Sequence, residues 1–197
     1  MPRPPRQLVD GGYYHLIARG NNRLFVLALA EGFVSFTHLL GQGKAKYPAQ
    51  LFHYCLMTNH LHLLLRIDQG ADLPKFMQFL LLGYSRWYRT HTNYTGHLWQ
   101  GRYKSPRIAE ESYLFECGRY IERNPLRAGV VQQAEAYPWS SYRHYALGEQ
   151  NPLVDEDPYY LSLGPDGPTR QQRYRDFVKL EGPYDGLVDH ALVEAHF

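Results

Sequence analysis

Two apolar runs that are separated by a short break constrain the fold of this chain more than any other feature. Residues 52–57 and 61–67 are each apolar and of strand length, and each run is bounded by polar or turn-forming residues. The break between them, Thr58-Asn59, has the length of the tightest hairpin connections. The two runs therefore predict a β-hairpin.

Five further segments follow the patterns of strands and helices. In chain order they are a strand over 13–19, a helix over 24–40 that ends at Gly41, a helix over 74–89, a strand over 102–109 and a helix over 113–123. The last helix is expected to end near Asn124, because a proline, here Pro125, disfavours helix in the residue before it.

This order of elements predicts an α+β fold with a ferredoxin-like domain. Strand, helix, strand, strand, helix, strand is the split βαβ pattern, which forms an antiparallel sheet, and the helix over 113–123 is an addition to it. After Gly148 the composition changes to an acidic segment that is interrupted by prolines. The chain is therefore expected to consist of one domain over residues 1–149 and an appendage of open role over residues 150–197.

Charge is divided unevenly along the sequence. Residues 151–197 carry four Lys or Arg and nine Asp or Glu, a formal charge of −5, whereas residues 1–150 carry 17 and 10, a formal charge of +7. A basic body favours a polyanionic partner such as nucleic acid. No apolar run has the length of a membrane span or a secretory signal, and the cysteines Cys55 and Cys117 have apolar neighbours. A cytoplasmic protein without a membrane partner is therefore expected.

Two histidines around the start of the second run of the hairpin form a candidate metal site. Side chains alternate between the faces of a strand, so His60 and His62 point to one face while Leu61, Leu63 and Leu65 point to the other. Two neutral imidazoles at this spacing can chelate one ion. Because His-x-His is a short pattern, two surface histidines on a half-buried strand are the competing interpretation.

A tyrosine and an asparagine lie one turn apart at the end of the helix predicted over 113–123. Tyr120 and Asn124 share a helix face. A phenol can act as a nucleophile toward a phosphodiester, and an amide oxygen can complete the ligands of a metal ion beside two histidines. In a chain with 17 tyrosines, the competing interpretation is that Tyr120 packs and Asn124 caps the helix.

Five segments make the chain resemble the REP-associated tyrosine transposases, which are similar to the single-tyrosine transposases of bacterial insertion sequences with a histidine–hydrophobic–histidine motif. They lie in order between about residues 10 and 145, and they are YYHLIARGNNR, MTNHLHLLL, HLWQGRYKSPRI, RYIERNPLRAGVV and YPWSSYRHY. The resemblance implies a ferredoxin-like catalytic domain in which Tyr120 is the nucleophile. It also implies that His60, His62 and Asn124 bind Mg²⁺ or Mn²⁺. Tyr113 is the rival nucleophile, but it lacks the family's distance to Asn124-Pro125.

The function that this resemblance implies is the cleavage and rejoining of single-stranded DNA through a 5′-phosphotyrosine. The implied target is a palindromic hairpin with a short flanking tetranucleotide. Mixtures of basic, amide and aromatic side chains suit such DNA. The expected DNA contacts are Arg19, Asn21, Asn22, Arg23, Trp99, Arg102, Tyr103, Lys104 and Arg107. The protein is expected to be a monomer or a homodimer.

Other functions are compatible with parts of the pattern. A metal-dependent nuclease that uses water would keep His60 and His62 but would not need Tyr120. A non-catalytic regulator descended from a transposase would bind hairpin DNA without a metal ion. A hydrolase of small phosphate esters fits the histidine pair but not the basic body. The ligand set itself would also suit Zn²⁺ or Ni²⁺.

Overall fold

The computed structural model describes residues 8–109, 112–180 and 186. At its centre lies a four-stranded antiparallel sheet with the order β2-β3-β1-β4. Its strands are β1 (Gly12–Arg19), β2 (Ala49–Leu56), β3 (His60–Ile67) and β4 (Arg107–Ile108). This arrangement is that of a ferredoxin-like domain, so the predicted fold class is confirmed.

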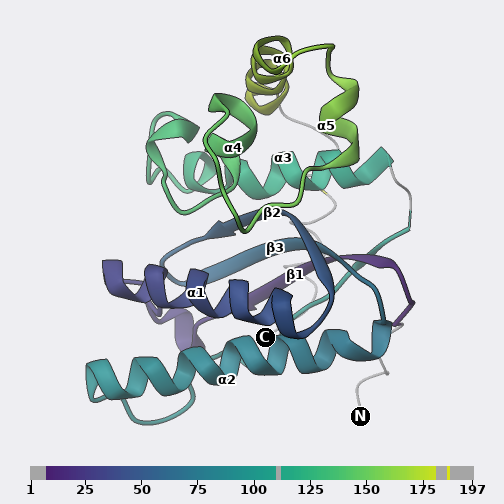
Figure 1. Cartoon of the computed structure of the whole chain (residues 1–197). Coiled ribbons are helices and arrows are strands. Elements are labelled where there is room, and N and C mark those ends of the chain that lie inside the picture. Colours follow the sequence, from purple (N-terminus) through teal and green to yellow (C-terminus); the bar gives the residue numbers. More distant parts are fainter. Residues whose placement is uncertain (1–7, 110–111, 181–185, 187–197) are drawn as a thin grey trace.

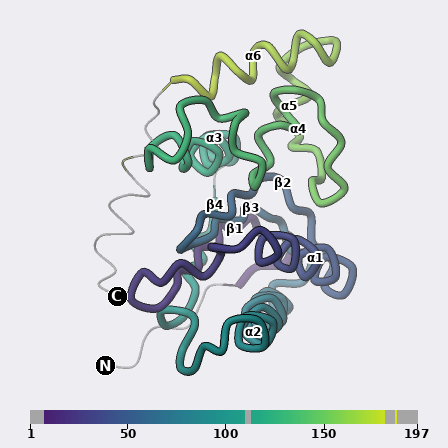
Figure 2. Tube along the Cα trace, turned by 90° about the vertical axis from the view of Figure 1, so that its left-hand side faces the viewer, coloured from purple at the N-terminus to yellow at the C-terminus, as the bar shows by residue number. Residues whose placement is uncertain are grey.

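Helices cover both faces of the sheet (Figure 1). On one face lie α1 (Ala30–Lys46) and α2 (Leu73–Thr92), and across the other face lies α3 (Ser112–Arg127). Beside α3, on the side away from α1 and α2, lie α4 (Tyr142–Leu147), α5 (Pro158–Ser162) and α6 (Gly167–Lys179), as the turned view also shows (Figure 2). Short 3-10 helices are η1 (Asn21–Arg23), η2 (Gly70–Asp72) and η3 (Ala134–Ala136). No helix in the described residues has both the length and the apolar character that crossing a membrane requires.

The predicted hairpin is confirmed in β2 and β3. Leu56 pairs with Leu61, and the Met57 N–H donates to the His60 carbonyl at 2.8 Å. Leu61, Leu63 and Leu65 are fully buried in the core beneath α1 and α2. The alternate residues of β3 face α3 instead, where Leu64 is fully buried as well. Both faces of this strand are therefore covered.

The first helix lies further along the chain than the predicted range 24–40, because α1 spans Ala30–Lys46. The prediction that it ends at Gly41 was wrong, since glycines inside α1 serve packing. A Cβ at Gly43 would lie 3.0 Å from the Phe76 ring of α2, so this position lets the two helices approach closely. Residues 24–29 form a loop whose Leu27 N–H donates to the Thr58 carbonyl at 2.8 Å.

Helix α3 does not end near Asn124 as predicted but continues through Pro125 to Arg127. A proline inside a helix leaves the carbonyl four residues earlier without its usual N–H donor. Here the Asn124 side chain compensates, because its Nδ2 donates to the Tyr120 carbonyl at 2.9 Å and to the Ile121 carbonyl at 3.3 Å. The last turn of α3 therefore persists beyond Asn124.

The fourth strand is shorter than the predicted range 102–109, since β4 contains only Arg107–Ile108. The preceding segment forms isolated bridges with β1 and with the residue that follows β1, namely Ile17 with Lys104 and Gly20 with Trp99. Pro106 has no N–H to donate to a neighbouring strand, which interrupts regular pairing at this point.

The division of the chain at residue 149 stays a prediction about domain organisation. In the structure, the described residues beyond it, up to Leu180, share a core with the body. Tyr160 and Tyr174 pack in one buried cluster with Tyr142 and Tyr145 of α4. This segment therefore contributes to the environment of α3.

Candidate functional site

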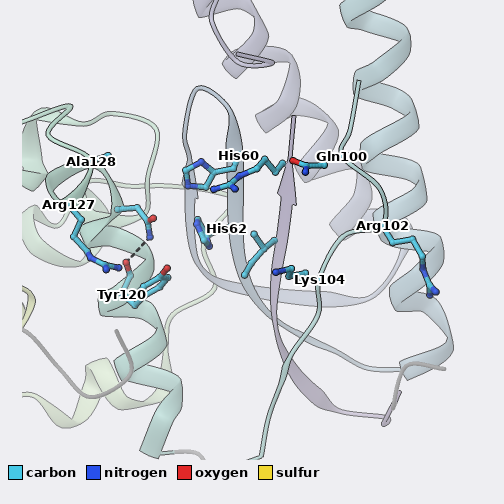
Figure 3. A pocket seen from close by; sticks show the side chains of 11 residues that line it. His60, His62, Gln100, Arg102, Lys104, Tyr120, Arg127 and Ala128 are labelled. Carbon is cyan, nitrogen blue, oxygen red and sulfur yellow. Dashed lines mark hydrogen bonds between the residues drawn. The ribbon is translucent and has the colours of Figure 1, made fainter. Parts of the chain in front are cut away.

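A cavity of about 270 Å³ lies between the sheet and the C-terminal half of α3 (Figure 3). The structure brings together here all four residues predicted for the chemistry, which are His60, His62, Tyr120 and Asn124. Three of the predicted DNA contacts also line it, namely Arg19, Arg102 and Lys104. Gln100 and Arg127 line it too, and sequence analysis did not predict them.

Strand β3 places the two histidines of the motif side by side. The ring centroids of His60 and His62 are 5.0 Å apart, and the ring planes are nearly perpendicular, at 84°. His60 Nδ1 lies 2.6 Å from Oδ1 of Asn59, so Nδ1 carries the ring proton and the other nitrogen keeps a lone pair. The Asn124 side chain lies within hydrogen-bonding reach of His60. Because its Nδ2 is held by the helix backbone, the amide oxygen faces His60.

A third histidine, His15 of β1, was missed by the sequence analysis. β1 pairs with β3 so that Ile17 lies opposite His62, and His15 is two residues away on the same face. His15 is fully buried, and its Nε2 lies 2.8 Å from Nδ1 of His62. This contact leaves Nε2 of His62 as the nitrogen for a ligand in the cavity. A partner of this kind fixes the orientation and tautomer of a ligating imidazole.

Burial keeps the three imidazoles neutral. It lowers the pKa of His15 to about 3. Burial and the nearby Arg19 lower the pKa of His60 to about 4, although the hydrogen bond with Asn124 acts in the opposite direction. Burial, followed by the neighbouring His60 and His15, also lowers the pKa of His62 well below 6.5. The neutral imidazole is the form that binds a metal ion.

The arrangement of acceptors at the cavity fits a cation. In the part of the chain that the structure describes, no three His, Cys, Asp or Glu side chains gather as a metal site, so a shell here would need a further donor such as the amide of Asn124. His60, whose Nδ1 contacts Asn59, lies within reach of the Asn124 side chain. His62 borders the same cavity. Nitrogen and oxygen donors of this kind suit a divalent metal ion.

Helix α3 brings Tyr120 to the cavity from the side opposite the sheet (Figure 3). The side chain is only 2% exposed, so its position is well defined. Its ring lies edge-on to the rings of His15 and His62, with centroid distances of 5.9 and 5.8 Å. The rival Tyr113 packs against the apolar cluster beneath α3 and does not line the cavity.

The other predicted DNA contacts lie outside the cavity and stay predictions. Asn21–Arg23 form the exposed 3-10 helix η1. Trp99 is half-buried, and its Nε1 donates to the Leu81 carbonyl of α2 at 3.0 Å, which fixes the indole on the protein. Tyr103 is also half-buried, whereas Arg107 is exposed on β4.

A buried charged network holds α3 on the face that points away from the cavity. His53 of β2 is fully buried, with Nδ1 3.0 Å from Oε1 of Glu122 and Nε2 3.1 Å from Oδ2 of Asp157. The Ser141 and Tyr174 hydroxyls each donate to the Glu122 carboxylate at 2.6 Å. Glu122 follows Tyr120 by two residues, so the network fixes the helix that carries the candidate nucleophile.

The stability of the fold is expected to fall as the pH rises through about 9. Burial by itself lowers the pKa of His53, but hydrogen bonds to Asp157 and Glu122 outweigh it and raise the pKa from 6.5 to about 9. Since the folded-state value is the higher one, this stabilisation is complete below about pH 6.5 and is lost between there and about pH 9. Urea unfolding across this window should show a loss of roughly 1–3 kcal/mol in the free energy of unfolding. A flat profile would contradict a charged His53.

Comparisons with known proteins cover most of this site. A family model described as IS200-like transposase matches residues 8–124. A protein of Haemophilus influenzae that is assigned as a REP-associated tyrosine transposase is 22% identical over 158 residues, which are 71% of this chain and 90% of the relative. A solved structure of a REP-associated tyrosine transposase bound to a REP hairpin has a TM-score of 0.64 and 19% identity. The match covers 79% of this chain and 91% of that one, and it shows a shared fold.

Proposed function

Because the chain belongs to the IS200-like transposase family, we propose that it cleaves and rejoins single-stranded DNA with Tyr120 as the nucleophile. The observation that carries this proposal is the meeting of Tyr120 with His60 and His62 at one cavity, from opposite sides. A palindromic hairpin is the substrate that we propose, because the solved structure with the same fold is described as bound to a REP hairpin.

The chemistry needs no external energy source. A bond forms between Oη of Tyr120 and phosphorus while the bond from phosphorus to the 3′ oxygen breaks. The phenol proton passes to solvent, and the leaving 3′ oxygen takes up a proton. The 5′ end stays on the protein as a phosphotyrosine, so a second 3′-hydroxyl can reverse the step and join a different strand.

His60, His62 and Asn124 would hold a divalent ion, Mg²⁺ or Mn²⁺. Such an ion supplies positive charge that polarises the scissile phosphate. The residues behind these ligands keep them in place, since Asn59 fixes the tautomer of His60 and His15 that of His62. The buried position of Tyr120 holds its ring against the histidines, so the Tyr120 side chain loses little conformational freedom when DNA binds.

Phosphates of the DNA would meet the basic side chains of the cavity. Arg19, Arg102 and Lys104 approach from β1 and from the segment before β4. Burial and the neighbouring Arg19 lower the pKa of Lys104, so an incoming phosphate also relieves the repulsion between these two cations. Contacts of this kind position the strand, whereas base contacts would select its sequence.

Removal of divalent ions is expected to abolish the covalent adduct, because the positive charge of the ion then no longer offsets the negative charge of the scissile phosphate. A hairpin oligonucleotide with a label at either end is mixed with the protein in Mg²⁺, in Mn²⁺ or in EDTA, and a denaturing gel is run. The 3′-labelled fragment, which carries the released 5′ end, should migrate with the protein in metal, and at least about 100-fold less of it in EDTA.

The same gel separates the alternative functions. Cutting without an adduct in metal would identify a nuclease that uses water. Binding without cutting on several hairpins would favour a non-catalytic regulator. An undiminished adduct in EDTA would contradict the metal site at His60, His62 and Asn124 but not the role of Tyr120.

A further inference from the structure

We propose that Arg127 is a catalytic residue of this reaction, whose guanidinium binds the phosphate that Tyr120 attacks and then holds it in the phosphotyrosine. This inference rests on the proposed function and adds a residue to it. Arg127 lies just beyond residues 8–124, which the family model matches.

The position of Arg127 on α3 connects it to the nucleophile. It follows Tyr120 by seven residues, which is two helical turns, so both side chains lie on one face of the helix. Its Cζ is 5.1 Å from the centroid of the Tyr120 ring, in the range of a cation–π contact. Arg127 also lines the cavity with His60 and His62, and it is exposed, so DNA can reach it (Figure 3).

The backbone around Arg127 is held in place although a proline precedes it. The Ala128 N–H donates to the Asn124 carbonyl and the Val130 N–H donates to the Pro125 carbonyl, both at 2.9 Å. These bonds close the last turn of α3. A helix C-terminus carries partial negative charge, which favours a cation such as Arg127 at this end. The Arg127 side chain is therefore attached to a hydrogen-bonded helical turn beside Tyr120.

The charges of the cavity place a phosphate between two groups of cations. Arg19 lies at the end of β1. Lys104 comes from the sheet side, whereas Arg127 comes from the helix that carries the nucleophile (Figure 3). A guanidinium can donate two parallel hydrogen bonds to two phosphate oxygens. Because Arg127 lies over the Tyr120 ring, it reaches the phosphate both before and after phosphorus bonds to Oη. A guanidinium does not give up its proton in proteins, so the effect of Arg127 on the phosphate is electrostatic.

Arg127→Gln is expected to lower the rate of adduct formation at saturating hairpin by about 100-fold or more, since a positive charge next to the reacting phosphate is lost. The Kd for the hairpin should rise by less than about tenfold, as expected for one phosphate contact among several. Arg127→Lys should recover part of the rate, because it keeps the charge but not the two-pronged geometry. The matched control is Arg86→Gln, on the exposed side of α2, which removes the same charge away from the cavity.

Single-turnover kinetics with 3′-labelled hairpin, a binding titration and the Tm of each variant test the proposal. A wild-type rate for Arg127→Gln overturns it, and so does a variant that is slow only because it binds less DNA. If the Gln variant unfolds, Arg127→Met, which keeps the aliphatic stem over Tyr120, takes its place. A wild-type protein that forms no adduct overturns the proposed function and the role of Arg127 with it.

Discussion

Tyr120→Phe is expected to abolish the covalent adduct and to leave hairpin binding close to wild type. The substitution removes the oxygen that would bond to phosphorus. It keeps the ring, and with it the edge contacts to His15 and His62 and the guanidinium contact of Arg127. Loss of a nucleophile typically reduces the rate by at least about 10³-fold. Labelled hairpin on a denaturing gel, together with a binding titration, measures both quantities.

Tyr113→Phe is the matched control for this experiment. It removes a hydroxyl from the same helix, but Tyr113 does not line the cavity, so the adduct should form at close to the wild-type rate. An adduct that persists in Tyr120→Phe and disappears in Tyr113→Phe would identify Tyr113 as the nucleophile. Equal cutting without an adduct in both variants would favour a nuclease that uses water.

The parts of the site that the sequence predicts are those that depend on local geometry. His60 and His62 share a face because side chains alternate along any strand, and the short break before them indicates the hairpin. Tyr120 and Asn124 share a face because they are one helical turn apart. Each of these relations spans a few residues, so spacing suffices to find the two pairs, whereas their assignment to one site comes from the family resemblance.

The residues that sequence analysis missed depend on relations between distant segments or on an exception to a local rule. His15 reaches His62 only because β1 pairs with β3 in one particular register, and that register is not visible in the sequence. Arg127 was not predicted, because Pro125 places the expected end of the helix near Asn124. The Asn124 amide donates to the carbonyls of Tyr120 and Ile121, so the helix continues and carries Arg127 to the cavity.

The acidic C-terminal segment also makes a contact with a distant residue that the sequence pattern does not reveal. Its negative charge suggests a solvated surface, yet Asp157 is fully buried against His53, which is 104 residues away in the chain. A single buried carboxylate cannot be distinguished from its exposed neighbours by sequence pattern. The partner that stabilises it lies on β2, and only the tertiary fold brings the two together.

His53→Phe is expected to lower the free energy of unfolding by about 3–5 kcal/mol at neutral pH. Phenylalanine keeps a planar ring against Gly118, where a Cβ would come within 2.6 Å of the imidazole. It removes the cation between Glu122 and Asp157, so two buried carboxylates lose their common partner. Urea unfolding measures the change, and His38→Phe on the exposed face of α1 is the matched control, with an expected effect of no more than about 0.5 kcal/mol.

The pH profile of the same variant tests whether charge, rather than packing, is the cause. In the wild type, the stability that His53 contributes is complete below pH 6.5 and is lost as the pH rises to about 9. His53→Phe cannot titrate, so this fall should be absent and the two proteins should differ less at high pH than at pH 6.5. A variant with the slope of the wild type, or with its full stability, would show that another group stabilises α3. A smaller difference in stability at high pH would instead show that a charged His53 links the segment around Asp157 to Glu122. Glu122 lies on the helix that carries Tyr120.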